Sequence, residues 1–179
     1  MLEASDTALA LIDVQGKLAT LMHEKEKLYR NLRILVQGAV ALELPILWLE
    51  QYPEGLGPTI PEVAELLEGR QPLAKTCFSA CGQPEFARRL EESGRKQVLL
   101  AGIETHICVY QTARDLRGSG YLVEVVEDAV SSRTPANKRV GLEKMRAAGA
   151  GITSVETALF ELLRQAGTPE FREIARLVK

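Results

Sequence analysis

Six short apolar segments alternate with amphipathic segments along the whole chain, and this alternation constrains the fold more than any other feature. Most of the apolar segments are rich in Leu, Val and Ile, and turn residues bound them. Runs of this kind are typical of strands that are buried on both faces of a sheet. The sequence therefore predicts six strands, at 7–13, 45–50, 72–76, 96–103, 121–127 and 149–155.

The segments between the apolar runs have helical spacing. Proline stands at several of their starts and glycine at several of their ends, as is common for helices. They cover 24–44, 61–69, 84–94, 109–120 and 135–149, and two more helices are expected on either side of Gly167-Thr168-Pro169. Strands that alternate with helices form a parallel sheet covered on both sides. We expect a three-layer α/β/α fold, a single domain over residues 1–179, with a six-stranded parallel sheet in the common order 3-2-1-4-5-6.

Charge and cysteine content exclude several classes of function. A net charge of -2 gives no electrostatic basis for binding nucleic acid or an anionic membrane. No apolar run approaches the roughly 20 residues that a membrane span requires. The three cysteines do not make a disulfide framework, and the N-terminal segment lacks the basic start of a signal peptide. We expect a cytoplasmic protein that acts on a small-molecule substrate.

Three reactive side chains stand at the ends of predicted strands. Asp13 ends the first strand, Lys75 ends the third, and Cys108 follows the fourth at the start of a helix. In open parallel sheets, ligands bind beyond the carboxyl ends of the strands, where the strand order reverses. Because the first and fourth strands are neighbours in the expected order, Asp13 and Cys108 should face each other, with Lys75 on the same edge.

These residue types together indicate nucleophilic catalysis. A helix N-terminus and a nearby ammonium both lower the pKa of a thiol, so we expect the pKa of Cys108 to lie between about 5 and 7. Asp13 would take the thiol proton and later return it to a leaving group. Each residue also has a structural explanation: Asp13 as a helix cap, Lys75 as a solvated charge and Cys108 as a small packed side chain.

Five motifs follow one another along the chain: LALIDVQ (9–15), EQYPEGLGPT (50–59), KTCFSA (75–80), LAGIETHICVYQTARDL (100–116) and VVEDAVSSR (125–133). In order and spacing they resemble the isochorismatase-like cysteine hydrolase superfamily, most closely its small branch of uncharacterised isochorismatase-domain hydrolases. The resemblance extends from about Thr7 to Leu163.

The resemblance implies a catalytic triad of Asp13, Lys75 and Cys108. It also implies a cis peptide bond between Ile103 and Glu104, which turns the amides of Glu104 and Cys108 inward as an oxyanion hole. Members of this family are commonly homo-oligomers, so we expect a homo-oligomer here.

The chain departs from the metal-dependent nicotinamidase branch of the superfamily. That branch binds a metal through an Asp and histidines between the second and third strands. The corresponding segment here contains Glu50 and Glu54 but no histidine. Because zinc favours nitrogen and sulfur ligands, we expect no metal and no other cofactor.

Four further residues border the expected site and are candidates for substrate binding. Gln15 could hold either a loop or the substrate, with the structural role favoured, while Tyr52 and Cys77 are expected in the pocket wall. His106, two residues before the nucleophile, could tune the thiol, although packing or capping of the turn is favoured. Arg133 could meet a substrate carboxylate, but a structural or subunit-contact role is favoured.

The predicted function is hydrolysis of a small amide or related carbonyl C–N bond through an acyl-enzyme. Cys108 attacks the carbonyl carbon, Asp13 transfers the proton, and Lys75 holds the thiolate and the carboxylate in position. Two alternatives stay open. One is vinyl-ether hydrolysis of the isochorismatase type, which proceeds by acid catalysis and does not need the thiol. The other is a scaffold or binding protein that retains the fold without catalysis.

Overall fold

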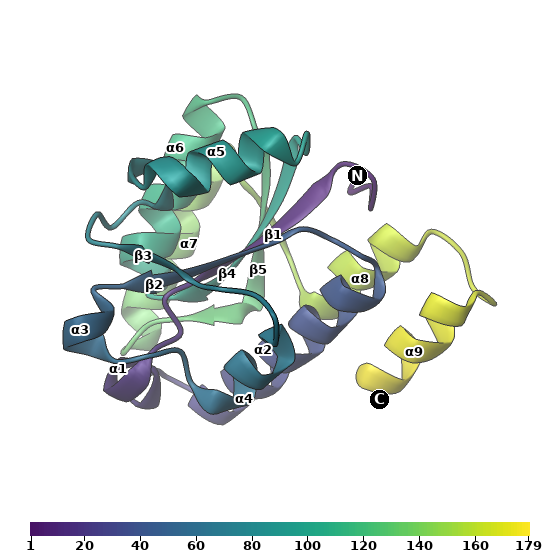
Figure 1. Ribbon diagram of the computed structural model, residues 1–179, viewed down its shortest axis with the longest axis horizontal. Helices are drawn as coiled ribbons and strands as arrows, with labels where there is room; N and C mark the ends of the chain where they lie inside the picture. The colour runs from purple at the N-terminus through teal and green to yellow at the C-terminus, as the bar shows by residue number, and fades with distance from the viewer.

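A six-stranded, entirely parallel sheet forms the centre of the computed structural model, which describes residues 1–179 (Figure 1). The strand order is β3-β2-β1-β4-β5-β6, so the predicted order 3-2-1-4-5-6 is confirmed. The strands are β1 (Thr7–Ile12), β2 (Ile46–Gln51), β3 (Leu73–Lys75), β4 (Gln97–Ile103), β5 (Leu122–Ser131) and β6 (Gly151–Thr153).

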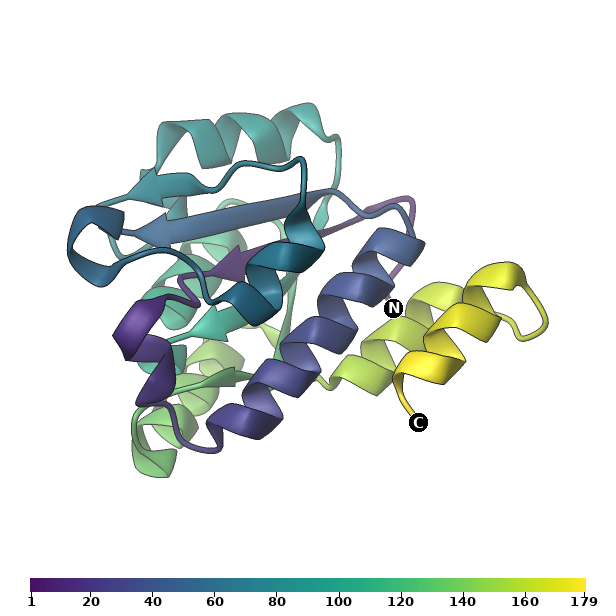
Figure 2. The ribbon, with the colours of Figure 1, turned by 60° about the horizontal axis from the view of Figure 1, so that its bottom comes forward.

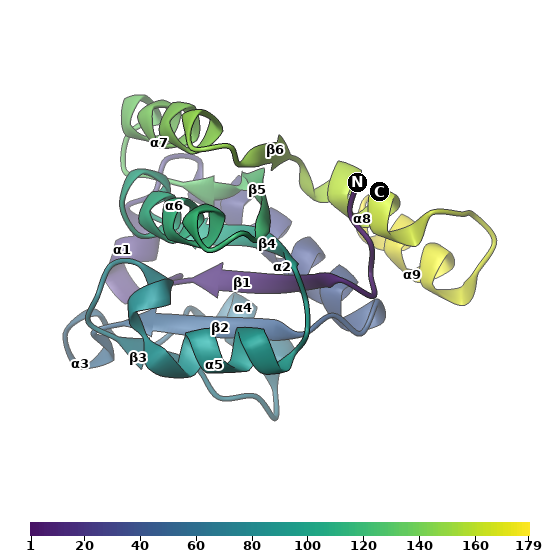
Figure 3. The same ribbon diagram turned by 90° about the horizontal axis from the view of Figure 1, so that it is seen from above.

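Helices cover both faces of this sheet, as the views from the front and from above show (Figures 1 and 3). One face carries α2, α4 and α8, and the other carries α5, α6 and α7. The α-helices are α1 (Gly16–Thr20), α2 (Lys25–Ala41), α3 (Pro53–Leu56), α4 (Pro61–Ala64), α5 (Pro84–Glu92), α6 (Tyr110–Gly118), α7 (Pro135–Ala147), α8 (Val155–Leu163) and α9 (Pro169–Leu177). Shorter turns are η1 (Glu65–Leu67), η2 (Ala80–Gly82) and η3 (Thr105–Val109). None of the helices has the length and apolar character needed to cross a membrane.

The central strand β1 is buried on both faces, which explains why apolar and polar residues do not alternate along it. All six of its residues are buried. Leu9 and Leu11 pack into the core on the α2 side, whereas Ala8, Ala10 and Ile12 pack into the core on the α5 side. Because successive strand side chains point to opposite faces, a strand with a helical layer on each side needs apolar residues at every position.

The two C-terminal helices extend the layer on the α2 face (Figure 2). The predicted break at 167–169 is present, since α8 ends at Leu163 and α9 begins at Pro169. The hydroxyl of Thr168 caps α9 by accepting a hydrogen bond from the amide of Phe171 at 3.1 Å. Ile174 buries the apolar side of α9 in the same core as α2.

The fifth strand is longer than its apolar run predicts, because β5 continues to Ser131 instead of ending at residue 127. The register of the β4–β5 pair shifts between Leu100 and Gly102, after which Gly102 pairs with Val130. A Cβ at Gly102 would collide with the carbonyl oxygen of Ile12, and the φ of Gly102 is +114°. The irregularity lets strand pairing resume beyond the polar residues that interrupt the hydrophobic pattern.

Candidate active site

The structure brings the three predicted catalytic residues to the carboxyl edge of the sheet. Asp13 follows β1, Lys75 is the last residue of β3, and Cys108 lies in the π-helical turn η3 after β4. Their exposed fractions are only 2%, 3% and 7%. Two charged groups that water normally solvates are therefore enclosed together with a thiol at one place in the protein.

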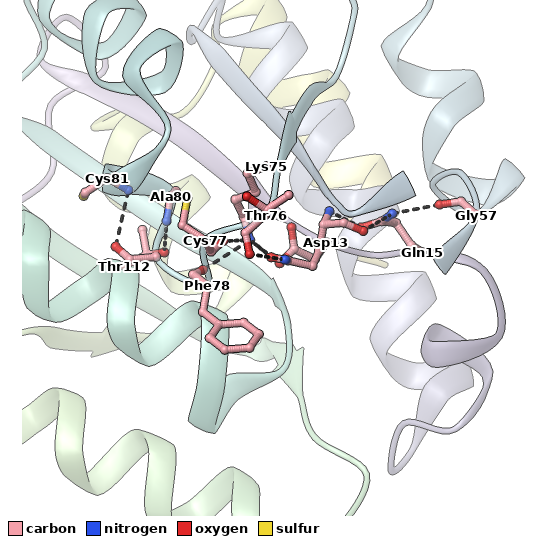
Figure 4. A network of polar contacts seen from close by, with 12 residues as sticks. Asp13, Gln15, Gly57, Lys75, Thr76, Cys77, Phe78, Ala80, Cys81 and Thr112 are labelled. Atoms are coloured by element: carbon pink, nitrogen blue, oxygen red, sulfur yellow. Dashed lines mark hydrogen bonds and ion pairs between the residues drawn. The ribbon is translucent and has the colours of Figure 1, made fainter. Parts of the chain in front are cut away.

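Lys75 is directed at Asp13 and not at the sulfur. Its ammonium lies within hydrogen-bond distance of four oxygen atoms, although it has only three protons to donate. These acceptors are Asp13 Oδ2 at 2.7 Å, Gln51 Oε1 at 2.6 Å, and the carbonyls of Cys77 and Phe78, both at 3.2 Å (Figure 4). The protein itself thus satisfies the ammonium, which serves as a fixed positive charge beside the carboxylate.

The Asp13 carboxyl combines one bound oxygen with one free oxygen. Oδ2 accepts a hydrogen bond from Lys75 Nζ, whereas Oδ1 is buried and has no hydrogen-bond partner. Burial raises the pKa of Asp13 above its usual value, although the charge and hydrogen bond of Lys75 oppose this shift. A carboxylate with a raised pKa and an unoccupied oxygen is suited to accept a proton.

Cys108 does not have the lowered pKa that its sequence position predicts, and that prediction is wrong. Burial, followed by the negative charge of Asp13, raises the pKa of Cys108 to about 12. The charge of Lys75 opposes this effect but does not overcome it, because Asp13 already neutralises the ammonium. The thiol is therefore protonated at neutral pH, and it needs a base when it attacks a substrate.

The turn that carries Cys108 begins at a cis peptide bond between Ile103 and Glu104, the position that the family resemblance implies. The amide N–H of Glu104 donates no hydrogen bond within the protein. The Glu104 carboxylate is buried, and its Oε2 accepts from the backbone amide of Arg133 at 3.0 Å and from Arg133 Nε at 3.2 Å. Arg133 thus contacts a side chain of the nucleophile turn.

Gln15 holds a loop. Its Nε2 donates to the carbonyls of Gly57 at 2.7 Å and Gln51 at 3.1 Å, and its Oε1 accepts from the Gln51 amide at 2.6 Å (Figure 4). The side chain is completely buried. These contacts agree with the structural role that the sequence favoured for Gln15.

The other three candidates lie at the margin of the site. Tyr52 and Cys77 line a cavity of about 280 Å³ that also borders Lys75. His106 does not hydrogen-bond to Cys108, because its Nδ1 lies 3.0 Å from the hydroxyl of Ser132. The His106 ring therefore fastens the nucleophile turn to the end of β5.

The segment that carries the metal ligands in nicotinamidases has another function here. Glu50 is buried, and its Oε1 accepts hydrogen bonds from both the amide and the hydroxyl of Thr59, each at 2.7 Å. Trp48 Nε1 donates to the same hydroxyl at 2.8 Å. No group of three or more His, Cys, Asp or Glu side chains is arranged to hold a metal ion. Glu50 instead fixes the loop that returns to the edge of the site.

Sequence analysis missed Gln51, whose side chain binds Lys75 directly. It is the last residue of β2, and its position as a polar side chain ending an apolar strand at the carboxyl edge is the signal that could have identified it. Asp13 and Lys75 were found by that same criterion.

Comparison with known proteins identifies the family. The model of the isochorismatase domain matches residues 7–157. The chain belongs to the isochorismatase family of hydrolases. The secreted isochorismatase effector Isc1 of Phytophthora sojae is 41% identical to this isochorismatase-family protein over 178 residues, covering 97% of this chain and 84% of Isc1.

Solved structures show the same architecture. The MAR1 ribonuclease of Caenorhabditis elegans superposes with a TM-score of 0.93 and 35% identity, covering 99% of this chain and 91% of MAR1. YcaC of Pseudomonas aeruginosa, solved with hexane-2,5-diol and covalent acrylamide, has a TM-score of 0.90 and 25% identity, covering 99% and 95% of the two chains. YcaC of Escherichia coli, an octameric hydrolase of unknown specificity, has a TM-score of 0.89 and 25% identity, covering 99% and 86%.

Proposed function

We propose that this isochorismatase-family protein hydrolyses a small amide, or a related carbonyl C–N bond, with Cys108 as the nucleophile. The observation that carries the proposal is the buried ion pair of Lys75 and Asp13, in which Asp13 Oδ1 is left without a partner beside the thiol. A neutral thiol needs a base close by, and this carboxylate oxygen is available to accept its proton.

The first half of the reaction forms a thioester. The Cys108 sulfur attacks the carbonyl carbon while the thiol proton moves to Asp13. The amides of Glu104 and Cys108 stabilise the tetrahedral oxyanion by hydrogen bonding, and the unpaired amide of Glu104 supports this assignment. The C–N bond then breaks, and Asp13 gives its proton to the leaving nitrogen.

The second half releases the acid. Water attacks the thioester carbon, and Asp13 takes one of its protons. The C–S bond breaks, and the proton returns from Asp13 to the sulfur. Lys75 keeps its positive charge throughout, and it stabilises the Asp13 carboxylate whenever that group is ionised.

Three observations favour this function over its alternatives. The covalent acrylamide in the structure of YcaC supports a reactive nucleophile in this family. Vinyl-ether hydrolysis would make no use of a thiol beside a proton acceptor. MAR1 is named a ribonuclease, but a net charge of -2 gives this chain little attraction for a polyanion.

We further propose that residues 1–179 form one domain and that the protein is a cytoplasmic homo-oligomer. The octameric state of E. coli YcaC supports assembly into an oligomer. The relative Isc1 is named a secreted protein, so localisation requires its own measurement in cells.

A panel of small amides assayed for ammonia release tests the function. Wild type should release ammonia from at least one member, and Cys108→Ala should release none while remaining folded. Asp13→Asn should lower turnover by about 10²–10⁴-fold, the usual contribution of a general base. Ammonia release by Cys108→Ala at the wild-type rate would refute the nucleophile assignment.

A further inference from the structure

Gln51 contacts the Lys75 ammonium through its side chain and the Gln15 side chain through its backbone. We propose that Gln51 is a positioning residue, which aims the Lys75 ammonium at Asp13 and so keeps the proton acceptor ready for Cys108. This inference rests on the proposed function. Gln51 ends β2, and it stands directly opposite Lys75 in the β2–β3 register.

The orientation of the Gln51 amide is determined by its neighbours. Its Oε1 accepts from Lys75 Nζ at 2.6 Å, and its Nε2 donates to the carbonyl of Thr76 at 2.7 Å. Turning the amide over would place an NH₂ group against an ammonium and an oxygen against a carbonyl, which are both repulsive. These two contacts favour the orientation in which the oxygen of Gln51 faces Lys75.

The backbone of Gln51 is held as firmly as its side chain. Its amide donates to Gln15 Oε1, and its carbonyl accepts from Gln15 Nε2. Gln15 is completely buried, so this anchor does not exchange with water. A rigid anchor on the main chain and a fixed amide on the side chain together define one position for the oxygen that Lys75 contacts.

Gln51 also determines how the ammonium is oriented. Lys75 makes two short contacts, to Asp13 Oδ2 and Gln51 Oε1, and two longer ones of 3.2 Å to backbone carbonyls. Without the Gln51 oxygen, the ammonium can turn toward the carbonyls and leave Asp13. A neutral acceptor suits this place because a second carboxylate would compete with Asp13 for the same positive charge.

Acrylamide is a suitable probe, since its addition requires the thiol to lose a proton but does not require a known substrate. The sulfur bonds to the terminal carbon of the C=C bond, and the thiol proton passes by way of Asp13 to the adjacent carbon. We would measure the rate of adduct formation at Cys108 by mass spectrometry between pH 4 and 9. The proteins are wild type, Gln51→Met, Gln51→Glu, Gln97→Met and Cys108→Ala.

Gln97→Met is the matched control. Gln97 is a buried glutamine whose amide accepts hydrogen bonds from Glu3 and Thr7, but it begins β4 at the opposite end of the sheet. Both Gln→Met variants lose a hydrogen-bonded amide, so urea denaturation should show comparable losses of stability. The reactivity of Cys108 should change only in the variant whose lost hydrogen bonds alter the position of Lys75 relative to Asp13.

We expect Gln51→Met to slow adduct formation at pH 7 by about 10-fold or more, as misplacement of a catalytic group does, while Gln97→Met stays within about 3-fold of wild type. Gln51→Glu should react faster than Gln51→Met, and the acidic limb of its rate profile should shift to higher pH than in wild type. A second carboxylate, added to the existing charge of Glu50, makes Asp13 harder to ionise.

Equal rates and equal pH profiles for Gln51→Met and Gln97→Met would overturn the positioning role. An unchanged acidic limb in Gln51→Glu would overturn it as well. The proposed function is tested separately, because it fails if the Cys108→Ala protein still releases ammonia in the amide assay, whatever the glutamine variants do.

Discussion

Replacing Lys75 by Met leaves the Asp13 carboxyl buried without its partner, and the energetic consequence can be worked from the structure. The two side chains are 0% and 2% exposed and their charged atoms lie 2.7 Å apart. Methionine keeps most of the volume of lysine, so the change removes charge and hydrogen bonds more than packing. Removing one partner of a buried ion pair costs about 3–5 kcal/mol of stability.

Protonation of Asp13 sets an upper limit on this loss. The pKa of Asp13 is already raised in the wild type, and without Lys75 it should rise further. Holding a carboxyl neutral at pH 7, when its unfolded-state pKa is about 3.9, costs about 4 kcal/mol at 1.36 kcal/mol per pH unit. We therefore expect Lys75→Met to lose about 3–4 kcal/mol at pH 7.

The sign of the pH dependence follows from the raised pKa. A carboxyl whose folded-state pKa lies above its unfolded-state pKa favours folding in its protonated form. The variant thus keeps its stability below about pH 4 and loses it as the pH rises toward the folded-state pKa of Asp13. Between pH 5 and 7, its deficit against wild type should grow by about 2 kcal/mol.

Urea denaturation of wild type, Lys75→Met, Asp13→Asn and the double variant, at pH 5 and pH 7, measures both quantities. The double variant should be more stable at pH 7 than Lys75→Met alone, and the additional pH dependence should disappear. A deficit below about 1 kcal/mol, or one that is the same at both pH values, would show that Asp13 is not an enclosed carboxylate.

Three other outcomes are expected. Asp13→Asn removes the negative charge that raises the pKa of Cys108, so the pKa of this thiol, followed by the ultraviolet absorbance of the thiolate against Cys108→Ala, should fall below that of wild type although turnover decreases; an unchanged or higher pKa would contradict the electrostatic account. Amide hydrolysis should survive exhaustive chelation, and a stoichiometric transition metal found by elemental analysis would contradict this expectation. Gly102→Ala should cost about 3 kcal/mol or more in urea denaturation because its Cβ would meet the Ile12 carbonyl, whereas Gly118→Ala, which enters open space, should change stability by less than about 1 kcal/mol.

The layered architecture could be predicted from the sequence because strand and helix periodicities are local properties. Ala8–Ile12 is apolar at every position, and this pattern is typical of a strand with helices on both faces. Strand order then follows from a small number of permitted connections. Local patterns failed at β5, where the register with β4 shifts between Leu100 and Gly102 and pairing then resumes at Val130, beyond the end of the apolar run.

The positions of Asp13, Lys75 and Cys108 could likewise be predicted, since the carboxyl ends of parallel strands meet at one edge. The ionisation states of these residues could not be predicted from the sequence. Whether the Cys108 thiol loses its proton depends on how deeply the sulfur is buried and on which charge lies nearest, and these are properties of the assembled site. The sequence indicated a helix N-terminus and a lysine, which both favour a thiolate. The fold buries the sulfur and places the Asp13 carboxylate near it, and both effects favour the neutral thiol.

Sequence alone determined the order of the layers and which reactive groups reach the carboxyl edge, because both depend on periodicity and on the ends of strands. Tertiary structure alone decided which group each of them contacts. Lys75 and Asp13 are 62 residues apart, and Gln51, which contacts Lys75, is 24 residues from it. No pattern within one element records such pairings, because a hydrogen bond of 2.6–2.7 Å depends on the relative placement of separate strands to within a fraction of an ångström.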